Sequence, residues 1–512
     1  MAPPRLILTG ASGFLGRHLL ELLKEQFEIL CLARRSQARC GAPYHPNIHW
    51  FQVDIADQRT LASVFRDIKD GGGAGIVIHL AAHYDFTGDE HPEYYRTNYH
   101  GLRNVLEECC KIGIGHFIFS SSTAACAFPP EGAALNERSP ADGEHIYART
   151  KALGEAMLNQ YRQNFPSVIV RFAALVSDWC EYPPLYMFLR TWLSSAWNSR
   201  ILGGAGESAI PYLHVRDGVS FLLRLIDRID QMEQGEILIA SPNGSVSHRE
   251  LYIAATHYFF ENTRTPLYIP RPLVRPGIKI NGLLGRFMNE KPFEKPWMAK
   301  YVDKKMTVDA THSMQRLGWQ PRQRLEILRR LPFMLENLKA YPVEWTQRNR
   351  DAMKLVRERP NLKVYSLLGK HHQAMSAAFT KALTEGAAHG QFASYQRVDE
   401  SEHRWNHRLV IRHLMNTVRT RERTLFISYC QDLAERRMEQ GFTSEELCGA
   451  LGELNRICIE TLMADPDAQD ILPFLHEHIT TTIRFGCDQV QETYELAEER
   501  RQRQSSGDPL SR

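Results

Sequence analysis

The sequence predicts an α/β protein, in which a doubly wound parallel sheet with a smaller lobe precedes an all-α helical bundle. Three observations lead to this prediction. Short, continuously apolar runs alternate with helix-length segments in the first third of the chain, as in buried parallel strands joined by crossover helices. Prolines and aromatic residues become frequent after about residue 175. Beyond about residue 340, dense charge accompanies Leu, Ile and Met at helical spacing.

The first observation places each element of the expected sheet. The expected strands are residues 6–8, 27–32, 48–53, 76–80, 117–119 and 168–170. The helices expected between them are residues 14–25, 57–69, 93–111 and 144–164.

The other two observations set the domain boundaries. We expect the α/β domain over residues 1–345, with a nucleotide-binding core at about 1–175 plus returning segments and a substrate lobe mainly at 176–345. A helical domain for sensing or dimerisation follows over 346–501, and 502–512 are expected to be a disordered tail. Long helices are expected at 405–440, 444–464 and 471–501; Gly441 ends the first, and Thr443 with Glu446 has capping-box spacing for the second.

Composition narrows the classes of protein. Among 512 residues, 43% are hydrophobic and 24% are charged, which describes a globular protein. The net charge of +3 argues against a nucleic-acid binder that works by charge. Ten scattered cysteines have no zinc-site spacing, so we expect reduced thiols and no metal. A strand follows Met1 too closely for a signal peptide, and no run reaches the ~20 apolar residues of a membrane span. A cytoplasmic location is expected.

A glycine-rich loop follows the first strand and opens the first helix. Gly10 permits the tight turn, Gly13 lets the backbone approach a pyrophosphate, and Gly16 lets the helix pack against the sheet. The helix N-terminus offers N–H groups to the phosphates. We therefore expect a Rossmann-like dinucleotide site, with these loop residues as cofactor contacts: Thr9, Gly10, Ser12, Gly13, Phe14, Leu15 and Gly16.

The end of the second strand bears on the choice of cofactor. A carboxylate there would accept the ribose 2′-OH of NAD, but the chain has Arg34 and Arg35 instead. Two guanidinium groups suit a 2′-phosphate. NADP(H) is therefore favoured, with NAD(H) possible and two solvated surface arginines as the alternative interpretation.

Several motifs in the right order make residues 5–340 resemble the extended short-chain dehydrogenase/reductase family, in its epimerase/dehydratase/reductase group. The resemblance implies that Asp54 and Ile55 flank the adenine and that Asn98 steadies the central strands. The segment Tyr212–Asp217 resembles the part where the chain returns to the nucleotide-binding domain. Further cofactor contacts implied by the resemblance are Leu80, Ala81, Ala82 and Ser120.

The resemblance also implies a Ser-Tyr-Lys active site. Ser122 aligns with the position that holds the substrate oxygen. Tyr147 and Lys151 have the YxxxK spacing, which puts both side chains on one helix face. A free phenol has a pKa near ~10, and a nearby lysine cation and the nicotinamide charge favour the phenolate. Tyr147 would exchange a proton with the substrate oxygen, and Lys151 would also hold the nicotinamide ribose.

Several other residues stay open as candidates. Thr123 is the alternative for the hydroxyl role. His83, Tyr84 and Asp85 suit either substrate contact or loop packing. Glu137 suits a helix cap as well as a catalytic acid.

The aromatic cluster from Trp179 to Trp197 suits a pocket for an apolar substrate, but ordinary core is the more frequent use of such a cluster. Residues 433–447 resemble the helical N-terminal sensor domains of stress-response regulators of the RsbR type. A possible homodimer or a regulatory partner is expected to use these helices; the alternative is a bundle that only buries its own apolar faces. His403, His407 and His413 raise the idea of a haem or metal ligand, and the first two share a helix face. No third ligand follows at a suitable spacing, so solvated side chains are the usual interpretation.

Three functions follow as hypotheses. The first is an NADP(H)-dependent oxidoreductase that interconverts a carbonyl and an alcohol on a small organic substrate. The second is an NAD-dependent epimerase or dehydratase, which uses the same tyrosine. The third is a regulatory protein that senses the dinucleotide. Ser122, Tyr147 and Lys151 favour an enzyme, because a sensor needs the glycine loop but not the proton-transfer tyrosine.

Overall fold

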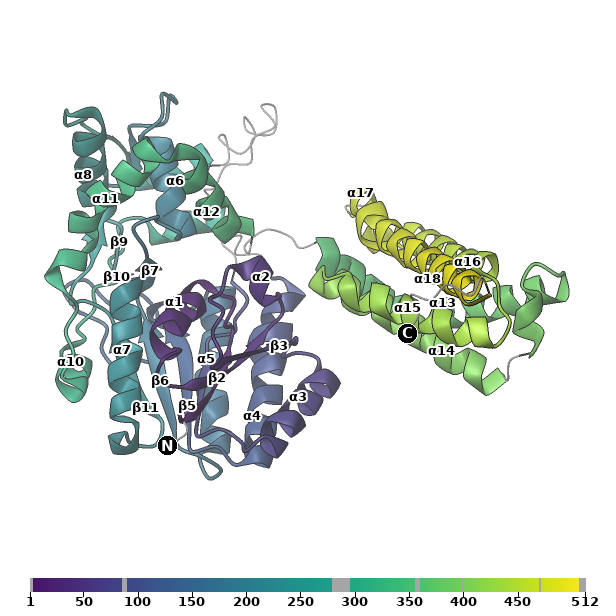
Figure 1. Ribbon diagram of the computed structural model, residues 1–512. Coiled ribbons are helices and arrows are strands. Elements are labelled where there is room, and N and C mark those ends of the chain that lie inside the picture. Colours follow the sequence, from purple (N-terminus) through teal and green to yellow (C-terminus); the bar gives the residue numbers. More distant parts are fainter. Residues whose placement is uncertain are drawn as a thin grey trace. The chain divides into compact units, whose positions relative to one another are not determined.

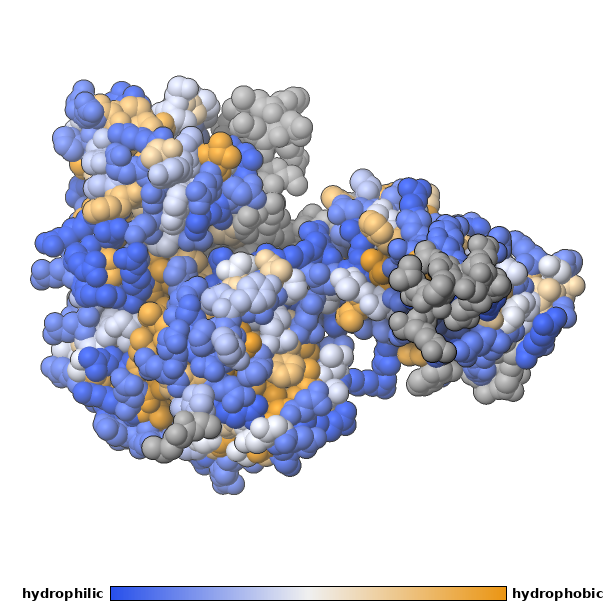
Figure 2. Space-filling view, in the orientation of Figure 1, coloured by the Kyte–Doolittle hydropathy of each residue, from blue (hydrophilic) through white to orange (hydrophobic). Residues whose placement is uncertain are grey.

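The computed structural model describes residues 3–84, 90–278, 295–354, 360–397, 400–468 and 471–505. The chain divides into two compact units, residues 1–357 and 358–512. Each is described by itself below. Hydrophilic residues cover most of the face of both units that Figure 2 shows.

A seven-stranded parallel sheet forms the centre of unit 1 (Figure 1). Its order is β11-β6-β5-β4-β1-β2-β3. The strands are β1 (Arg5–Thr9), β2 (Glu28–Ala33), β3 (Ile48–Gln52), β4 (Ile76–His79), β5 (His116–Ser122), β6 (Ser167–Phe172) and β11 (Glu236–Ala240). The strand order reverses between β1 and β4, and ligands of such sheets bind at the carboxyl ends of the strands at that point.

Apolar side chains on the two faces of the sheet pack under different helices. Leu6 and Leu8 of β1 belong to the core that includes α1 (Phe14–Leu23) and α7 (Val215–Asp227). Ile7, which points the opposite way because side chains alternate along a strand, belongs to the other core. The helices of that second face are α3 (Gln58–Asp70), α4 (Leu102–Ile112) and α5 (Ile146–Leu158). The predicted doubly wound architecture is therefore confirmed.

The six predicted strands are all present, and a seventh joins them. The seventh, β11, pairs with β6 in parallel, with Leu238 opposite Val170. The predicted return of the chain to the sheet also takes place, since α7 starts at Val215 and packs on α1.

The lobe of unit 1 has its own apolar core. It is built from α6 (Pro183–Trp192), α8 (His248–Phe260), α11 (Ile327–Ala340) and α12 (Pro342–Lys354). Trp345 of α12 is 2% exposed, and its ring lies 5.2 Å from that of Tyr186. The helix that spans the predicted boundary at residue 345 thus packs with unit 1.

Unit 2 is a helical bundle around one apolar core. Its main helices are α13 (Pro360–Ala388), α14 (Glu400–Thr420), α15 (Thr424–Glu439), α16 (Ser444–Met463) and α18 (Thr481–Ser505). The prediction of one helix over 405–440 is wrong, because α14 ends at Thr420 and Arg421 adopts a left-handed φ of 64°. The predicted capping box is confirmed: Thr443 Oγ1 accepts from the N–H of Glu446, whose carboxylate accepts from the N–H of Thr443. No helix in the described ranges is both long and apolar enough to cross a bilayer.

Candidate active site

The glycine loop lies against the end of β4. Gly10 has a φ of +71°, and a Cβ there would lie 2.6 Å from the backbone nitrogen of Ala81 and 2.8 Å from the carbonyl carbon of Leu80. Only glycine combines this left-handed φ with so close an approach. The loop therefore brings the start of α1 beside the β4 end.

The third glycine acts on the loop itself. A Cβ at Gly16 would lie 2.6 Å from the carbonyl oxygen of Gly10 and 2.8 Å from that of Ala11. The close contact is with the loop backbone, whereas the sequence led us to expect contact with the sheet. No side-chain cap bonds the first turn of α1, and that turn has no acidic residue. The helix N-terminus is thus suited to an anion such as a pyrophosphate.

Thr9 and His79 fix the neighbouring end of β4. Thr9 Oγ1 lies 3.0 Å from His79 Nδ1 and accepts from the N–H of Ala81 at 3.3 Å. Burial, with the charge of Lys151, lowers the pKa of His79 to about 3. The imidazole is therefore neutral, and the segment Leu80–Ala82 is held beside the glycine loop.

Asn98 ties the loop after β4 to α5. Its side chain accepts from the N–H of His83 at 2.6 Å and donates to the His83 carbonyl at 3.0 Å. It also donates to Thr150 Oγ1 at 3.0 Å. Asn98 thus links the segment after β4 to α5 by three hydrogen bonds.

The three residues of the expected catalytic set come together at the ends of β5 and α5. Ser122 ends β5, and Tyr147 and Lys151 lie on successive turns of α5. Lys151 Nζ donates to the Ser120 carbonyl at 2.6 Å and lies 5.8 Å from the centre of the Tyr147 ring. At Gly154 a Cβ would lie 2.6 Å from the ring of Phe119, so glycine lets α5 pack closely on β5.

Burial tunes the acidity of this set. It raises the pKa of Tyr147, against a hydrogen bond from Ser122 that favours the phenolate. It also lowers the pKa of Lys151 to about 8, against the opposing charge of Glu155. The serine hydroxyl and the tyrosine phenol are thus in contact, beside an amine that loses its proton more easily than a free lysine.

A buried ion pair beneath this set was not found from the sequence. Arg171 donates to both carboxylate oxygens of Glu155 at 3.0 and 2.7 Å. The Ser121 hydroxyl donates to the same carboxylate at 2.5 Å, and Arg171 also donates to the Ser139 carbonyl at 2.7 Å. The signal available in the sequence was the spacing of Lys151 and Glu155, one helical turn apart. The pair joins α5, β5 and β6 directly behind Lys151.

The part of the site where the sequence predicts the adenosine carries linked ion pairs. Arg34 donates to Glu93 at 2.7 Å, and Arg96 contacts Glu93 at 3.2 Å and Asp54 at 2.8 Å. Burial raises the pKa of Glu93, but Arg34 and Arg96 outweigh this effect and leave the pKa below its ordinary value. Arg35 instead reaches the backbone carbonyl of Ser12 in the glycine loop. The two arginines therefore have different partners, and Glu93 is a participant that the sequence did not reveal.

The contacts of the remaining candidate residues differ from one another. The Tyr84 ring lies 4.3 Å from that of Tyr147, so Tyr84 lines the site. Thr123 is buried and donates to the Phe172 carbonyl at 3.4 Å, while Ser122 contacts the phenol. Glu137 accepts from the N–H and the hydroxyl of Ser313 at 3.1 and 2.5 Å, which is a capping contact. Asp85 lies outside the described residues.

The aromatic cluster of the lobe serves mainly as core. Tyr186 and Trp192 are each 3% exposed and belong to the lobe core, whereas Trp197 is 71% exposed. Tyr182 differs, because the neighbouring phenol of Tyr147 adds to the effect of burial in raising its pKa. Tyr182 is therefore coupled electrostatically to Tyr147 while it packs on the lobe core.

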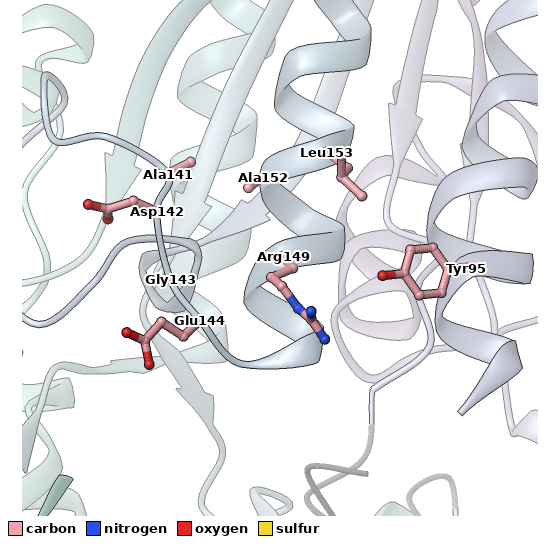
Figure 3. Close-up of a pocket in the computed structure, with 8 residues that line it drawn as sticks. All are labelled: Tyr95, Ala141, Asp142, Gly143, Glu144, Arg149, Ala152 and Leu153. Carbon is pink, nitrogen blue, oxygen red and sulfur yellow. The ribbon is translucent and has the colours of Figure 1, made fainter. Parts of the chain in front are cut away.

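An open hollow of about 660 Å³ lies on the opposite face of α5 (Figure 3). Arg149 and Leu153, which point away from the Tyr147 and Lys151 face, line it together with Tyr95 and the loop of residues 141–144. This hollow is separate from the catalytic set.

The histidines of unit 2 are engaged with neighbours. His407 Nδ1 lies 2.9 Å from Thr380 Oγ1, and the His413 ring stacks on Tyr429 at 4.4 Å. The side chain of His403 lies outside the described residues. Within the part of the chain that the structure describes, no cluster of three or more His, Cys, Asp or Glu has the arrangement of a metal site.

Comparison with known proteins gives two family matches. Residues 6–240 match the NAD dependent epimerase/dehydratase family, and residues 374–506 match the RsbT co-antagonist protein rsbRD N-terminal domain. Both resemblances expected from the sequence are thereby confirmed.

Individual relatives agree with the first match. UDP-glucose 4-epimerase of Caenorhabditis elegans is 30% identical over 174 residues, covering 30% of this chain and 48% of that protein. Uronate dehydrogenase of Pseudomonas putida is 28% identical over 194 residues, covering 37% and 66%. The chain spans about half the length of the UDP-glucose 4-epimerases that it matches.

A solved structure supports the fold alone. The Bordetella bronchiseptica enzyme WbmG, in complex with NAD, superimposes with a TM-score of 0.51 at 18% identity. The superposition covers 66% of this chain and 95% of that one.

Proposed function

We propose that unit 1, whose residues 6–240 match the NAD dependent epimerase/dehydratase family, is a nicotinamide-dependent oxidoreductase that interconverts a carbonyl and an alcohol on a small organic substrate. The observation that carries the proposal is the contact of Ser122 with Tyr147 beside Lys151, at the strand edge where the glycine loop lies. A protein that only senses a dinucleotide has no need of this set.

The residues present fit a dinucleotide. The uncapped start of α1 would hold the pyrophosphate, and Asp54, Ile55 and the Leu80–Ala82 segment would line its adenosine and nicotinamide sides. When bound, the nicotinamide supplies a hydride or accepts one. Lys151 would hold the nicotinamide ribose.

The chain's own residues supply the proton chemistry. Ser122 would donate a hydrogen bond to the substrate oxygen and stabilise negative charge that develops there. Tyr147 would give its phenolic proton to that oxygen during reduction, or take it during oxidation. The Lys151 ammonium would favour the phenolate of Tyr147.

We assign NADP(H) as the preferred cofactor, on the arginines that follow β2. Arg35 reaches the glycine loop, and Arg34 is held by Glu93. A 2′-phosphate would be held there by paired, charge-assisted hydrogen bonds from guanidinium groups.

An NAD-dependent epimerase or dehydratase is the second candidate. It is favoured by the epimerase relatives and by the engagement of Arg34 with Glu93, which lessens the charge that Arg34 offers to a phosphate. A dinucleotide-sensing regulator is the third, favoured by the match of residues 374–506 to a co-antagonist domain. On that match we also propose that unit 2 regulates or dimerises the enzyme.

Parallel titrations with NADPH and NADH, followed by nicotinamide fluorescence, test the assignment. Cofactor that co-purifies is measured first. A clear preference for NADPH is expected and leads to a screen of carbonyl substrates. Preference for NADH, or co-purified NAD(H), would overturn the NADP(H) assignment and favour the epimerase or dehydratase.

A further inference from the structure

Two cysteines face each other inside unit 2. Cys448 lies on α16 and Cys487 on α18. The Cys448 Sγ is 3.6 Å from the Cys487 carbonyl oxygen, and the Cys487 Sγ is 3.9 Å from the Cys448 carbonyl oxygen. Each sulfur thus reaches the backbone of the other residue. The two thiols therefore lie between α16 and α18, which pack against each other.

Exposure and acidity set this pair apart from the neighbouring cysteines. Cys448 and Cys487 are partly exposed, whereas Cys430 and Cys458 are fully buried in the same bundle. A hydrogen bond from the Cys487 thiol lowers the pKa of Cys448. Burial raises the pKa of Cys430 and of Cys458 to about 12. Cys448 therefore forms a thiolate most readily among these four, and thiolates react with oxidants.

A glycine beside the pair brings the helices close. A Cβ at Gly486 would lie 2.6 Å from the Phe426 ring and 2.8 Å from the Cys430 Sγ. Glycine at this position lets α18 lie directly against α15, and Cys487 is the next residue. The close packing around Gly486 limits how far α18 can move from α15 at the residue before Cys487.

We propose that Cys448 and Cys487 are a redox-active dithiol, which a hydroperoxide converts into a disulfide joining α16 to α18. The Cys448 thiolate attacks the terminal peroxide oxygen, the O–O bond breaks, and the alkoxide or hydroxide leaves and takes up a proton. The Cys487 sulfur then attacks the resulting Cys448 sulfenic acid, forming the S–S bond and releasing water. Two thiols are oxidised and one peroxide is reduced.

The disulfide would change the thermal stability of unit 2. It closes a loop between residues 39 apart in sequence, so it restricts the unfolded chain more than the folded one. The oxidised bundle is therefore expected to melt at a higher temperature than the reduced bundle. Thiol reductants reverse the bond by thiol–disulfide exchange.

The test uses the full chain treated with a few equivalents of hydrogen peroxide. We expect intact mass spectrometry to show a loss of two hydrogens, restored by dithiothreitol, and peptide mapping to find residues 448 and 487 crosslinked. C448S and C487S should each lose the mass change. C458S is the matched control, because Cys458 lies on α16 like Cys448. The C458S protein should still lose two hydrogens.

A second measurement detects the sulfenic acid directly. Dimedone added to peroxide-treated C487S should label Cys448, since the sulfenic acid then has no partner. A disulfide between any other pair in the wild-type protein would overturn the proposal. So would oxidation of Cys448 to sulfinic acid with no crosslinked peptide.

Discussion

The two ends of the proposed cofactor site hold charge in opposite ways. At the adenosine end, Arg34, Arg96, Glu93 and Asp54 pair with one another, and the pKa of Glu93 stays below its ordinary value. At the reaction end, Lys151 is buried against the Ser120 carbonyl, and its pKa falls to about 8. Paired charges keep ordinary protonation states, whereas an amine without a direct carboxylate contact becomes adjustable. Adjustable protonation is what proton transfer requires.

The largest test of this comparison is at the reaction end. Y147F removes the phenolic proton and keeps the ring that contacts Tyr84. Turnover should fall by about 100-fold or more, while cofactor affinity stays within a few-fold. Steady-state rates and a cofactor titration on the same sample measure both. F128Y, which alters an aromatic ring elsewhere, serves as a control, and unchanged turnover in Y147F would remove the proton-transfer role.

The ion pair behind Lys151 should show the next largest effect. E155Q leaves the Arg171 guanidinium buried without its carboxylate, and breaking such a pair costs about 3–5 kcal/mol. Loss of the carboxylate also lowers the pKa of Lys151 further, because Glu155 raises it. Chemical denaturation should therefore show lower stability, and the Lys151 limb of the pH–rate profile should move to lower pH. A stability loss with no shift of that limb would leave Glu155 a purely structural role.

The adenosine end should respond in cofactor preference. Replacing Arg34 and Arg35 together with alanine should weaken NADPH by about tenfold or more, since charge-assisted hydrogen bonds contribute roughly 1.5–3 kcal/mol. NADH should change much less. The single variants separate the two arginines, because Arg34 contacts Glu93 whereas Arg35 contacts the Ser12 carbonyl. Equal weakening of both cofactors in the double variant would contradict the 2′-phosphate assignment.

The smallest effect concerns stability against pH. The pKa of Lys151 is about 8 in the folded protein, against an ordinary value of 10.5. Between these values the unfolded chain binds one proton more than the folded one, so the free energy of unfolding should rise with pH across that interval. Denaturation of the wild type and K151M at pH 7.5, 9 and 10, taken as points spanning about that window, measures it. A parallel pH dependence in both proteins would show that another group is responsible.

Much of the fold of unit 1 could be predicted because its strands are continuous apolar runs. The seventh strand, β11, was missed since Glu236–Ala240 is short and lies among lobe segments. The break between α14 and α15 was missed for another reason. Arg421 carries the left-handed φ there, and neither glycine nor proline marks the position.

In the candidate site too, local features could be predicted from the sequence and long-range pairings could not. Ser122, Tyr147 and Lys151 have spacings that a strand end and a helix turn convert directly into proximity. The pairing of Arg34 with Glu93 joins residues 59 apart in sequence, and that of Glu155 with Arg171 joins two separate elements. Contacts of this kind depend on how strands are ordered in the sheet, so a local pattern cannot reveal them.

Helix α12, near the end of unit 1, holds the turn that leads into Tyr182. Asn349 of α12 accepts from the N–H of Glu181 at 2.9 Å and donates to the Trp179 carbonyl at 2.8 Å. Cys180 and Glu181 hold left-handed φ values of 71° and 54°, which cost free energy in residues other than glycine. Tyr182 is the next residue, and it packs on the lobe core. Removing the Asn349 amide would therefore release a strained turn that lies directly before Tyr182.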